Sequence, residues 1–297
     1  MSEISLEPFR DLYPFQSRFI ETGSHRLHYL DEGQGETLLM LHGNPTWSFY
    51  YRNLIKGMRS QFRCVVPDHM GCGLSDKPQD YNYTLSQHID NLELLVDHLN
   101  LDNITLIMHD WGGSIGMGFA VRHPEKIKRI VFFNTAAFLA DRIPFSINLC
   151  RNSFIGPLAI LKFNLFARAA VSWASKQPGR LRGRIRKGYL APYNSPENRI
   201  ANLRFVQDIP LSPDTPSYPV VEHIESQLGY FRDRPVLIIW GMQDFCFNEY
   251  FLDRWKKYFP EAEVHEVAEA GHYVVEDADE QIIPWVIQFL KKHPLRI

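Results

Sequence analysis

Short, almost continuously apolar runs recur along the chain, and most of them end at glycine, proline or a polar residue. Runs of this kind are typical of strands buried on both faces, as in the interior of a parallel sheet. The runs that we predict as strands are Thr37–Leu41, Arg63–Pro67, Ile104–Met108, Ile127–Phe133 and Pro235–Trp240, and Glu263–Val267 is predicted as the last strand. Ahead of them, Arg18–Thr22 and Arg26–Asp31 alternate apolar and polar residues around Gly23–Ser24, which predicts an antiparallel hairpin.

Between the predicted strands, apolar residues recur at the three- and four-residue spacing of amphipathic helices. These helices are expected at Thr84–Leu99, Ser114–Arg122, Asn248–Tyr258 and Asp279–Lys291. A further helix is predicted to begin near Trp47. The indole of Trp47 fits two roles equally well: it lines the entrance of a site, or it packs against that helix. Strands that alternate with helices predict an α/β fold, with a mostly parallel sheet, helices on both faces and right-handed crossovers.

The alternation stops between residues 139 and 222, where the pattern is helical, contains several prolines and offers no convincing buried strand. This segment is rich in bulky apolar side chains, among them Phe145, Phe154, Phe163 and Trp173. We therefore expect a core domain formed by residues 1–138 and 223–297, with residues 139–222 folded over the carboxyl edge of the sheet as a helical cap. The alternative is a helical subdomain with its own core that supplies no site residues.

The strand that ends near Met108 leads into Asp110, two glycines and a helix. A strand, a sharp turn and a helix with a reactive side chain at the apex form a nucleophile elbow, although Asp is also a common helix N-cap. Two later strands also end near residues that can carry chemistry, Asp244 and His272. Nucleophile, acid and histidine follow in the chain order of an α/β-hydrolase triad, and all three are expected at one edge of the sheet.

Composition narrows the function classes. The chain has 297 residues, 45% of them hydrophobic, and a net charge of −2, which argues against a nucleic-acid footprint. No apolar run is long enough to span a bilayer, and no secretory signal is visible at the N-terminus, so we expect a cytoplasmic protein. The four cysteines are irregularly spaced, which fits reduced thiols better than disulfides or zinc. A basic cluster at Arg180–Lys187 fits a solvated helix face, with contact to acidic lipid or a partner as the lesser alternative.

Four motifs resemble the haloalkane dehalogenase family of α/β-hydrolases. They are His42-Gly-Asn-Pro-Thr-Trp47, Asp68-His-Met-Gly-Cys-Gly-Leu-Ser-Asp-Lys-Pro78, His109-Asp-Trp-Gly-Gly113 and Gly271-His272. The resemblance implies an α/β-hydrolase fold with an inserted helical cap, in which Asp110 is the nucleophile, Asp244 the acid and His272 the base. Asn134 stands where some members carry the acid after an earlier strand. Asn44 and Trp111 match the two donors that hold the leaving halide in this family.

Segments in and around the cap are most similar to the third subfamily, which includes the β-lactone decarboxylases of bacterial long-chain olefin biosynthesis. They are Asn134-Thr-Ala-Ala-Phe138, Ala191-Pro-Tyr-Asn194 and Arg204-Phe-Val-Gln-Asp-Ile-Pro-Leu211. The resemblance implies decarboxylation of a long-chain cis β-lactone to an alkene, with hydrolysis of carbon–halogen bonds to alcohol and halide as the alternative. It implies a small hydrophobic substrate and neither metal nor cofactor. Assembly with other olefin-pathway enzymes, or with further copies of the chain, is a further expectation.

Three other functions remain as alternatives. An epoxide hydrolase also uses an Asp nucleophile but needs two cap tyrosines as acids, for which Tyr189, Tyr193 and Tyr218 are candidates. A serine esterase is disfavoured, because Ser114 lies four residues beyond the apex of the turn, within the predicted helix. A non-catalytic receptor could retain the pocket, but an intact triad with both donors argues against it. His109 is expected to have a structural role beside the site.

Overall fold

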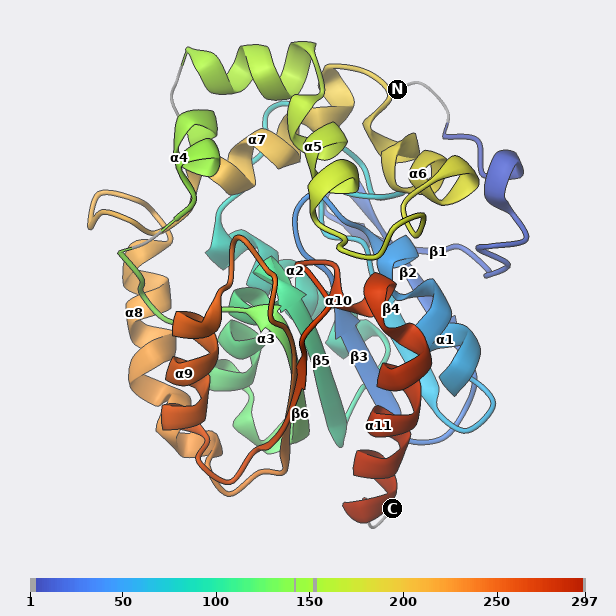
Figure 1. The fold of residues 1–297 in the computed structure, drawn as a ribbon, viewed down its shortest axis with the longest axis vertical. Helices are drawn as coiled ribbons and strands as arrows, with labels where there is room; N and C mark the ends of the chain where they lie inside the picture. The colour runs from blue at the N-terminus through green and yellow to red at the C-terminus, as the bar shows by residue number, and fades with distance from the viewer. Residues whose placement is uncertain (1–3, 142, 152–153, 296–297) are drawn as a thin grey trace.

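A computed structural model describes residues 4–141, 143–151 and 154–295. Its centre is an eight-stranded sheet in the order β1-β2-β4-β3-β5-β6-β7-β8 (Figure 1). The pairings of β1 with β2 and of β2 with β4 are antiparallel, and the remaining pairings are parallel. The strands are β1 (Arg18–Thr22), β2 (His25–Glu32), β3 (Thr37–Leu41), β4 (Arg63–Pro67), β5 (Ile104–Asp110), β6 (Ile127–Thr135), β7 (Val236–Gly241) and β8 (Glu263–Val267).

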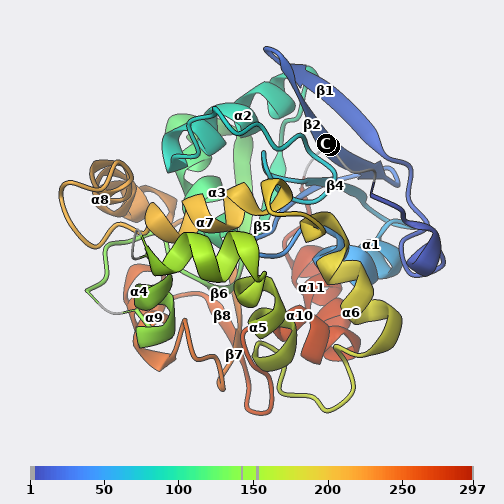
Figure 2. The same ribbon diagram turned by 90° about the horizontal axis from the view of Figure 1, so that it is seen from above.

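Helices cover both faces of this sheet (Figures 1 and 2). One face carries α1 (Arg52–Met58) and α11 (Asp279–Lys292), and the other carries α2 (Leu85–His98), α3 (Trp111–Arg122), α8 (Tyr218–Gln227) and α9 (Glu249–Tyr258). On β5, Leu106 and Met108 pack among the apolar residues of the second group, whereas Ile107 packs among those of the first. The strand is thus buried on both faces, which explains its uninterrupted apolar sequence. The predicted α/β fold with a mostly parallel sheet is confirmed.

Several element boundaries differ from the sequence-based prediction, and the differences gather around the elbow. Strand β5 runs two residues further than expected, to Asp110, and α3 begins at Trp111 rather than at Ser114. The turn between them is tighter than the glycine pattern indicated, because Asp110 alone forms it. Near Trp47 the expected helix opens with a short 3₁₀ segment, Ser48–Tyr51, before α1. A short helix that was not predicted, α10 (Val274–Asp277), follows His272.

The segment that we predicted as a cap contains helices and loops in its described residues and lies across the carboxyl edge of the sheet, at the top of Figure 1. Its helices are α4 (Phe145–Arg151), a π-helix (Pro157–Lys162), α5 (Leu165–Trp173), α6 (Gly183–Leu190) and α7 (Ile200–Gln207). Residues 142 and 152–153 of this segment lie outside the described residues, as do residues 1–3 of the N-terminus. Helix α8 runs through residue 222, where we expected the cap to end, and packs against α3. The division into core and cap stays a prediction.

Short 3₁₀ helices complete the described fold, at Glu7–Phe9, Pro124–Lys126, Ala191–Tyr193, Glu197–Arg199 and Leu228–Phe231. Within the described ranges, no helix combines the length and the apolar character that crossing a membrane requires. The same ranges contain no cluster of three His, Cys, Asp or Glu side chains placed to hold a metal ion. All four cysteines are free thiols, and burial raises the pKa of Cys72 to about 12, so this thiol stays protonated near neutral pH.

Candidate active site

Asp110 occupies the apex of the turn between β5 and α3 in a backbone conformation that few residues adopt, with φ of +51° and ψ of −126°. The turn is held by the Thr135 hydroxyl on β6, which donates a hydrogen bond to the Asp110 carbonyl oxygen. A Cβ atom at Gly113 would lie 1.9 Å from the same hydroxyl oxygen, so a side chain there would displace Thr135. Strain at this apex is therefore stabilised by the neighbouring strand, as is common at functional sites.

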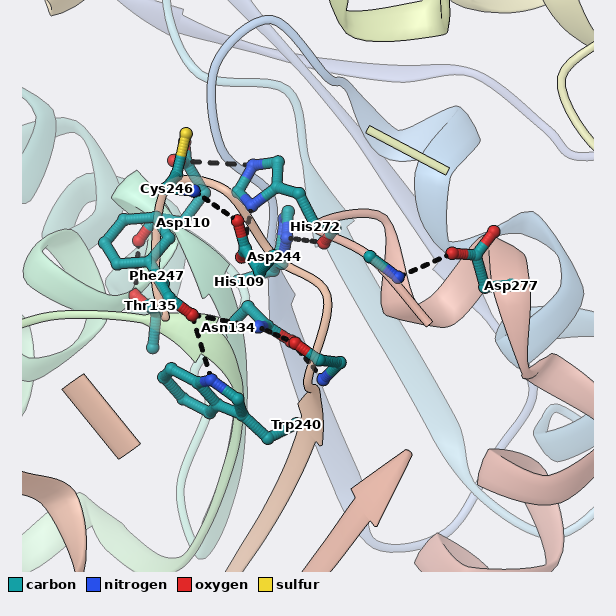
Figure 3. A network of polar contacts seen from close by, with 12 residues as sticks. His109, Asp110, Asn134, Thr135, Trp240, Asp244, Cys246, Phe247, His272 and Asp277 are labelled. Carbon is teal, nitrogen blue, oxygen red and sulfur yellow. Dashed lines mark hydrogen bonds and ion pairs between the residues drawn. The ribbon is translucent and has the colours of Figure 1, made fainter. Parts of the chain in front are cut away.

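His272 lies between the two acids that the sequence predicted, and Figure 3 shows the three side chains together. Its Nδ1 donates a hydrogen bond of 2.8 Å to Oδ2 of Asp244, whose other oxygen accepts the backbone N–H of Cys246 at 2.6 Å. Its Nε2 faces Oδ2 of Asp110 at 3.8 Å, which is beyond hydrogen-bond distance. The geometry thus joins Asp110, Asp244 and His272, which come from the ends of three different strands.

Both charged groups beside the cavity have shifted pKa values. Burial lowers the pKa of His272, but the charge and the hydrogen bond of Asp244 outweigh burial and raise it above its usual value. Burial raises the pKa of the Asp110 carboxyl, while His272 and the backbone N–H groups of Asn44 and Trp111 act in the opposite direction. The imidazolium form of His272 is therefore more populated near neutral pH than in an isolated histidine.

Asn44 and Trp111, the two predicted leaving-group donors, flank Asp110 and line the same cavity. The Asn44 backbone N–H donates to Oδ1 of Asp110 at 2.6 Å, which leaves Oδ2 of Asp110 facing His272. The Asn44 side-chain amide donates one hydrogen bond, of 3.2 Å, to the carbonyl oxygen of Asn202 on α7, and an amide nitrogen carries two N–H groups. This close approach requires glycine at position 43, where a Cβ atom would lie 2.0 Å from Oδ1 of Asp110.

The cavity above these residues has a volume of about 430 Å³, which is within the range of small-molecule sites. Asp110, Asn44, Trp111 and His272 contribute polar groups to its wall. Most of the remaining wall is apolar and comes from both the cap and the core, including Ile147, Leu165, Phe166, Trp173, Val206, Phe138, Phe245, Phe247 and Phe251. The arrangement fits an apolar molecule with a reactive carbon next to Asp110 and a polar leaving group between the two donors.

Two residues close to the triad have structural contacts. Asn134 exchanges hydrogen bonds with the backbone of Gly241, accepting from its N–H at 2.8 Å and donating to its carbonyl at 3.0 Å, so it ties β6 to β7 (Figure 3). Nε2 of His109 lies 2.8 Å from the His272 carbonyl oxygen, and burial lowers the pKa of His109 well below its usual value. A neutral His109 that donates to this carbonyl fixes the loop carrying His272.

Asp277 is a residue that sequence reasoning missed. Its Oδ2 accepts the backbone N–H of Gly271 at 2.8 Å and that of Lys176 at 2.9 Å, and Oδ1 accepts the Ser175 hydroxyl. It therefore connects the loop of His272 to a cap segment about one hundred positions earlier in the chain. An acidic residue shortly after a strand carries no sequence signal for this role, since the contact exists only in the folded chain.

The contacts of the other candidates limit the alternatives. The Tyr189 hydroxyl donates to Glu276 at 2.8 Å and the Tyr193 hydroxyl to the Thr46 carbonyl at 3.2 Å, and neither residue lines the cavity; nor does Tyr218. A pair of tyrosine acids for epoxide opening is therefore not formed by these residues. Ser114 lies in α3 and donates to the Ala136 carbonyl at 2.8 Å, which does not fit an esterase nucleophile. Trp47 is fully buried and donates to Gly188, so it packs the fold rather than an entrance.

The fold and the site are those of an α/β-hydrolase, and comparison with known proteins gives the same class. The model of the α/β hydrolase fold family matches residues 36–279, and the chain belongs to this family. A solved structure of haloalkane dehalogenase DbeA from Bradyrhizobium elkani shares the fold with a TM-score of 0.84 at 21% identity, over 94% of this chain and 99% of that chain.

More specific relatives place the chain within this family. It is 49% identical over 286 residues to the cis-3-alkyl-4-alkyloxetan-2-one decarboxylase of Shewanella oneidensis, covering 94% of this chain and 89% of the relative. It is 33% identical over 290 residues to haloalkane dehalogenase 2 of Mycobacterium tuberculosis, covering 96% and 98% respectively. The resemblance stated from the motifs is confirmed, and the chain is an enzyme related to both kinds of protein.

Proposed function

We propose that this enzyme converts a cis β-lactone with alkyl groups on both substituted ring carbons into an alkene and carbon dioxide. The observation that supports this most is the placement of Asp110, Asn44 and Trp111 in the wall of a largely apolar cavity of about 430 Å³. A relative that is 49% identical is named as a decarboxylase of such a ring, an oxetan-2-one with two alkyl substituents. The apolar wall fits the two alkyl chains, and the polar groups fit the ring.

In the first step, Oδ2 of Asp110 attacks the ring carbon that bears the ring oxygen. The bond between this carbon and the ring oxygen breaks, and its electron pair leaves with the oxygen, which becomes part of a free carboxylate. The Asn44 amide and the Trp111 indole N–H stabilise the charge that develops on this leaving group. The product is an ester of Asp110 in which the attacked carbon has inverted its configuration.

In the second step, the new carboxylate leaves as carbon dioxide. The electrons of the broken carbon–carbon bond form the double bond, and the ester oxygen leaves with its bonding pair to restore the Asp110 carboxylate. Inversion followed by elimination from opposite faces converts a cis lactone into a cis alkene. Neither water nor a cofactor enters the balance, so His272 is not required as a base along this route.

Hydrolytic dehalogenation is the second candidate, and the contacts of His272 favour it as an alternative activity. A haloalkane would form the same Asp110 ester, with halide as the leaving group. Water deprotonated by Nε2 of His272 would then attack the ester carbonyl, while Asp244 stabilises the imidazolium. The oxyanion would form on Oδ1, which already accepts the Asn44 backbone N–H.

A side-by-side assay tests the proposal. The purified enzyme is given a cis β-lactone with two long alkyl chains and, separately, a bromoalkane of similar length, and alkene and bromide are measured. We expect faster formation of cis alkene than of bromide. Bromide release with an inert lactone would instead make dehalogenation the main activity. The proposal also assigns the enzyme to long-chain olefin biosynthesis in the cytoplasm, with residues 139–222 as its cap; assembly with other enzymes of that pathway, or with further copies of this chain, stays a prediction.

A further inference from the structure

The basic side chains of this protein are concentrated in the cap. Residues 142–196 contain ten Lys or Arg and not one Asp or Glu. Because the whole chain has a net charge of −2 and this segment contributes +10, the remainder carries −12. Among the described residues of the segment, two cations pair with acids outside it: Arg180 with Asp279 and Glu280, and Arg184 with Asp11. Others project from exposed positions, among them Lys162, Arg168, Arg182 and Lys187.

The same part of the cap exposes large apolar side chains that a soluble surface rarely gathers in one place. Phe145 is 81% exposed, Leu158 52%, Phe163 49% and Trp173 62%. We call these four residues the apolar cap patch. They come from α4, the π-helix, the residue that follows it and α5, which lie together across the face seen in Figure 2.

The apolar cap patch meets the cavity at Trp173, which belongs to both. Leu149, Ile155, Leu165 and Trp173 line the cavity and are also 42% exposed or more. Phe145 and Leu149 further line a shallow depression beside it. If this face contacts a hydrocarbon phase, an apolar molecule can move from that phase to Asp110 along apolar side chains. It does not have to enter bulk water on the way. Helix α6, which carries three of the ten cations, lies beside α5, with Arg186 donating to the Ser172 hydroxyl.

We propose that this face of the cap docks on an anionic lipid bilayer and takes long-chain substrate from it directly into the cavity. Aromatic and aliphatic side chains surrounded by lysine and arginine are the composition of interfacial membrane-binding surfaces, where apolar burial and attraction to acidic lipid add together. Uptake of substrate rests on the proposed function, because the two alkyl chains of the lactone would place it in the bilayer. Docking of the protein on a bilayer does not depend on the proposed function.

A second copy of this chain is a poorer occupant of the same face. An isologous dimer would bring two segments of charge +10 together, and like charges across an interface oppose association. A bilayer supplies many negative charges without a fixed pattern, which suits cations distributed over several helices.

Flotation with vesicles, without any substrate, tests the docking. Wild-type enzyme is mixed with vesicles of phosphatidylglycerol and phosphatidylethanolamine, or of phosphatidylcholine alone. We expect binding to the anionic vesicles, little binding to phosphatidylcholine, and weaker binding at high salt. The double variant Lys162→Glu/Arg168→Glu should lower the partition coefficient by about tenfold or more, since each cation near the surface contributes about 1 kcal/mol. The triple variant Phe145→Ser/Leu158→Ser/Phe163→Ser should also lose binding.

Matched changes on other surfaces control for these variants. Leu94→Ser removes an exposed apolar side chain from α2, and Lys257→Glu/Lys291→Glu reverses two exposed charges on α9 and α11. Both controls should bind anionic vesicles as the wild type does. All variants should retain the wild-type melting temperature and turn over a short-chain, water-dissolved substrate normally, because none of the altered residues lines the main cavity.

Two outcomes would overturn the docking. One is a wild-type enzyme that does not float with anionic vesicles; the other is a patch or charge variant that floats as well as its matched control. If the patch variant instead abolishes self-association or binding to another protein while vesicles are ignored, the face is a protein interface and the inference is wrong. Failure of the lactone assay leaves the flotation result unaffected, so the two proposals fail separately.

Discussion

At the scale of single residues, the two oxygens of Asp110 have different surroundings. Oδ1 accepts the Asn44 backbone N–H at 2.6 Å, whereas Oδ2 faces Nε2 of His272 at 3.8 Å. The first oxygen is thus held where a carbonyl oxygen of an ester would be stabilised, and the second is placed for attack on a substrate carbon. Asp110→Ala should therefore reduce the turnover of both lactone and haloalkane to the background rate.

The need for His272 should depend on the substrate. With a bromoalkane, His272→Ala should allow attack but not hydrolysis, so the ester on Asp110 accumulates and intact-protein mass spectrometry shows the added alkyl group. With the cis lactone, no stable adduct should accumulate, because loss of carbon dioxide releases Asp110 without water. Absence of the alkyl adduct, with a bromoalkane that the wild type consumes, would contradict the role of His272 as the hydrolytic base.

Oxygen labelling separates the two routes in the wild-type enzyme. In water enriched in oxygen-18, bromoalkane turnover should place label in the Asp110 carboxylate, because water attacks the carbonyl carbon of the ester. Lactone turnover should leave Asp110 unlabelled, since water does not take part. The peptide containing Asp110 is analysed by mass spectrometry after many turnovers, with enzyme incubated without substrate as the control. Label incorporated during lactone turnover would show that the intermediate is hydrolysed.

The pH dependence of dehalogenation should report the pairing of His272 with Asp244. The base must be neutral, and Asp244 raises the pKa of His272 above its usual value against the effect of burial. The wild-type rate should therefore fall as pH decreases through a pKa above 6.5. In Asp244→Asn the raising charge is lost and burial remains, so this limb should move to lower pH while the plateau rate drops by roughly 100-fold or more. A pH–rate profile measures both effects, and an unmoved limb would contradict the pairing.

At the scale of elements, a buried ion pair joins three helices behind the site. Arg52 on α1 makes two hydrogen bonds of 2.7 Å to Glu276 on α10, and both side chains are 2% exposed. Tyr189 on α6 donates to the same carboxylate at 2.8 Å. Because Glu276 lies four residues after His272, this cluster connects the cap, the first helix of the core and the loop that carries the base.

Breaking this pair should destabilise the fold rather than change the chemistry. Glu276→Gln leaves the Arg52 guanidinium buried without its counter-charge and should lower the free energy of unfolding by about 3 kcal/mol or more. Tyr189→Phe removes one hydrogen bond and should cost about 1 kcal/mol. Urea unfolding followed by fluorescence measures both variants. Equal stabilities of Glu276→Gln and the wild type would show that the pair contributes little.

At the scale of the whole molecule, a tightly packed sheet supports a cap with a more exposed surface. Strands β3 and β5 are buried almost throughout, whereas α4 has no buried residue and Phe145 within it is 81% exposed. Local opening is easiest where few apolar contacts hold an element. In hydrogen exchange, amides of β3 and β5 should therefore remain protected far longer than those of 143–151.

Hydrogen exchange in the presence of anionic vesicles tests whether the cap contacts lipid. If the cap docks on lipid, exchange in α4 and the π-helix should slow when phosphatidylglycerol vesicles are present, while exchange in β3 and β5 stays unchanged. Phosphatidylcholine vesicles serve as the control and should leave both regions as in solution. Equal exchange in the cap and the central strands without vesicles would contradict the difference in packing.

The sequence alone determined the order of the elements and the bounds of three strands. Thr37–Leu41, Arg63–Pro67 and Glu263–Val267 agree with β3, β4 and β8 residue for residue. Local periodicity reports how a segment is buried, and glycine, proline and polar residues mark where it stops, so these features need no knowledge of distant contacts. The order of Asp110, Asp244 and His272 likewise indicated a triad before any distance was known.

Only the tertiary structure decided how these residues meet. The 2.8 Å contact of His272 with Asp244, the binding of Asp277 to both the His272 loop and the cap, and the burial of Trp47 depend on segments far apart in the chain. The sequence named bulky cap residues, but the position of several of them around one cavity follows from how the helices pack. Periodicity shows which face of a helix or strand avoids water. Whether a neighbouring element covers that face, and which one, depends on the whole fold.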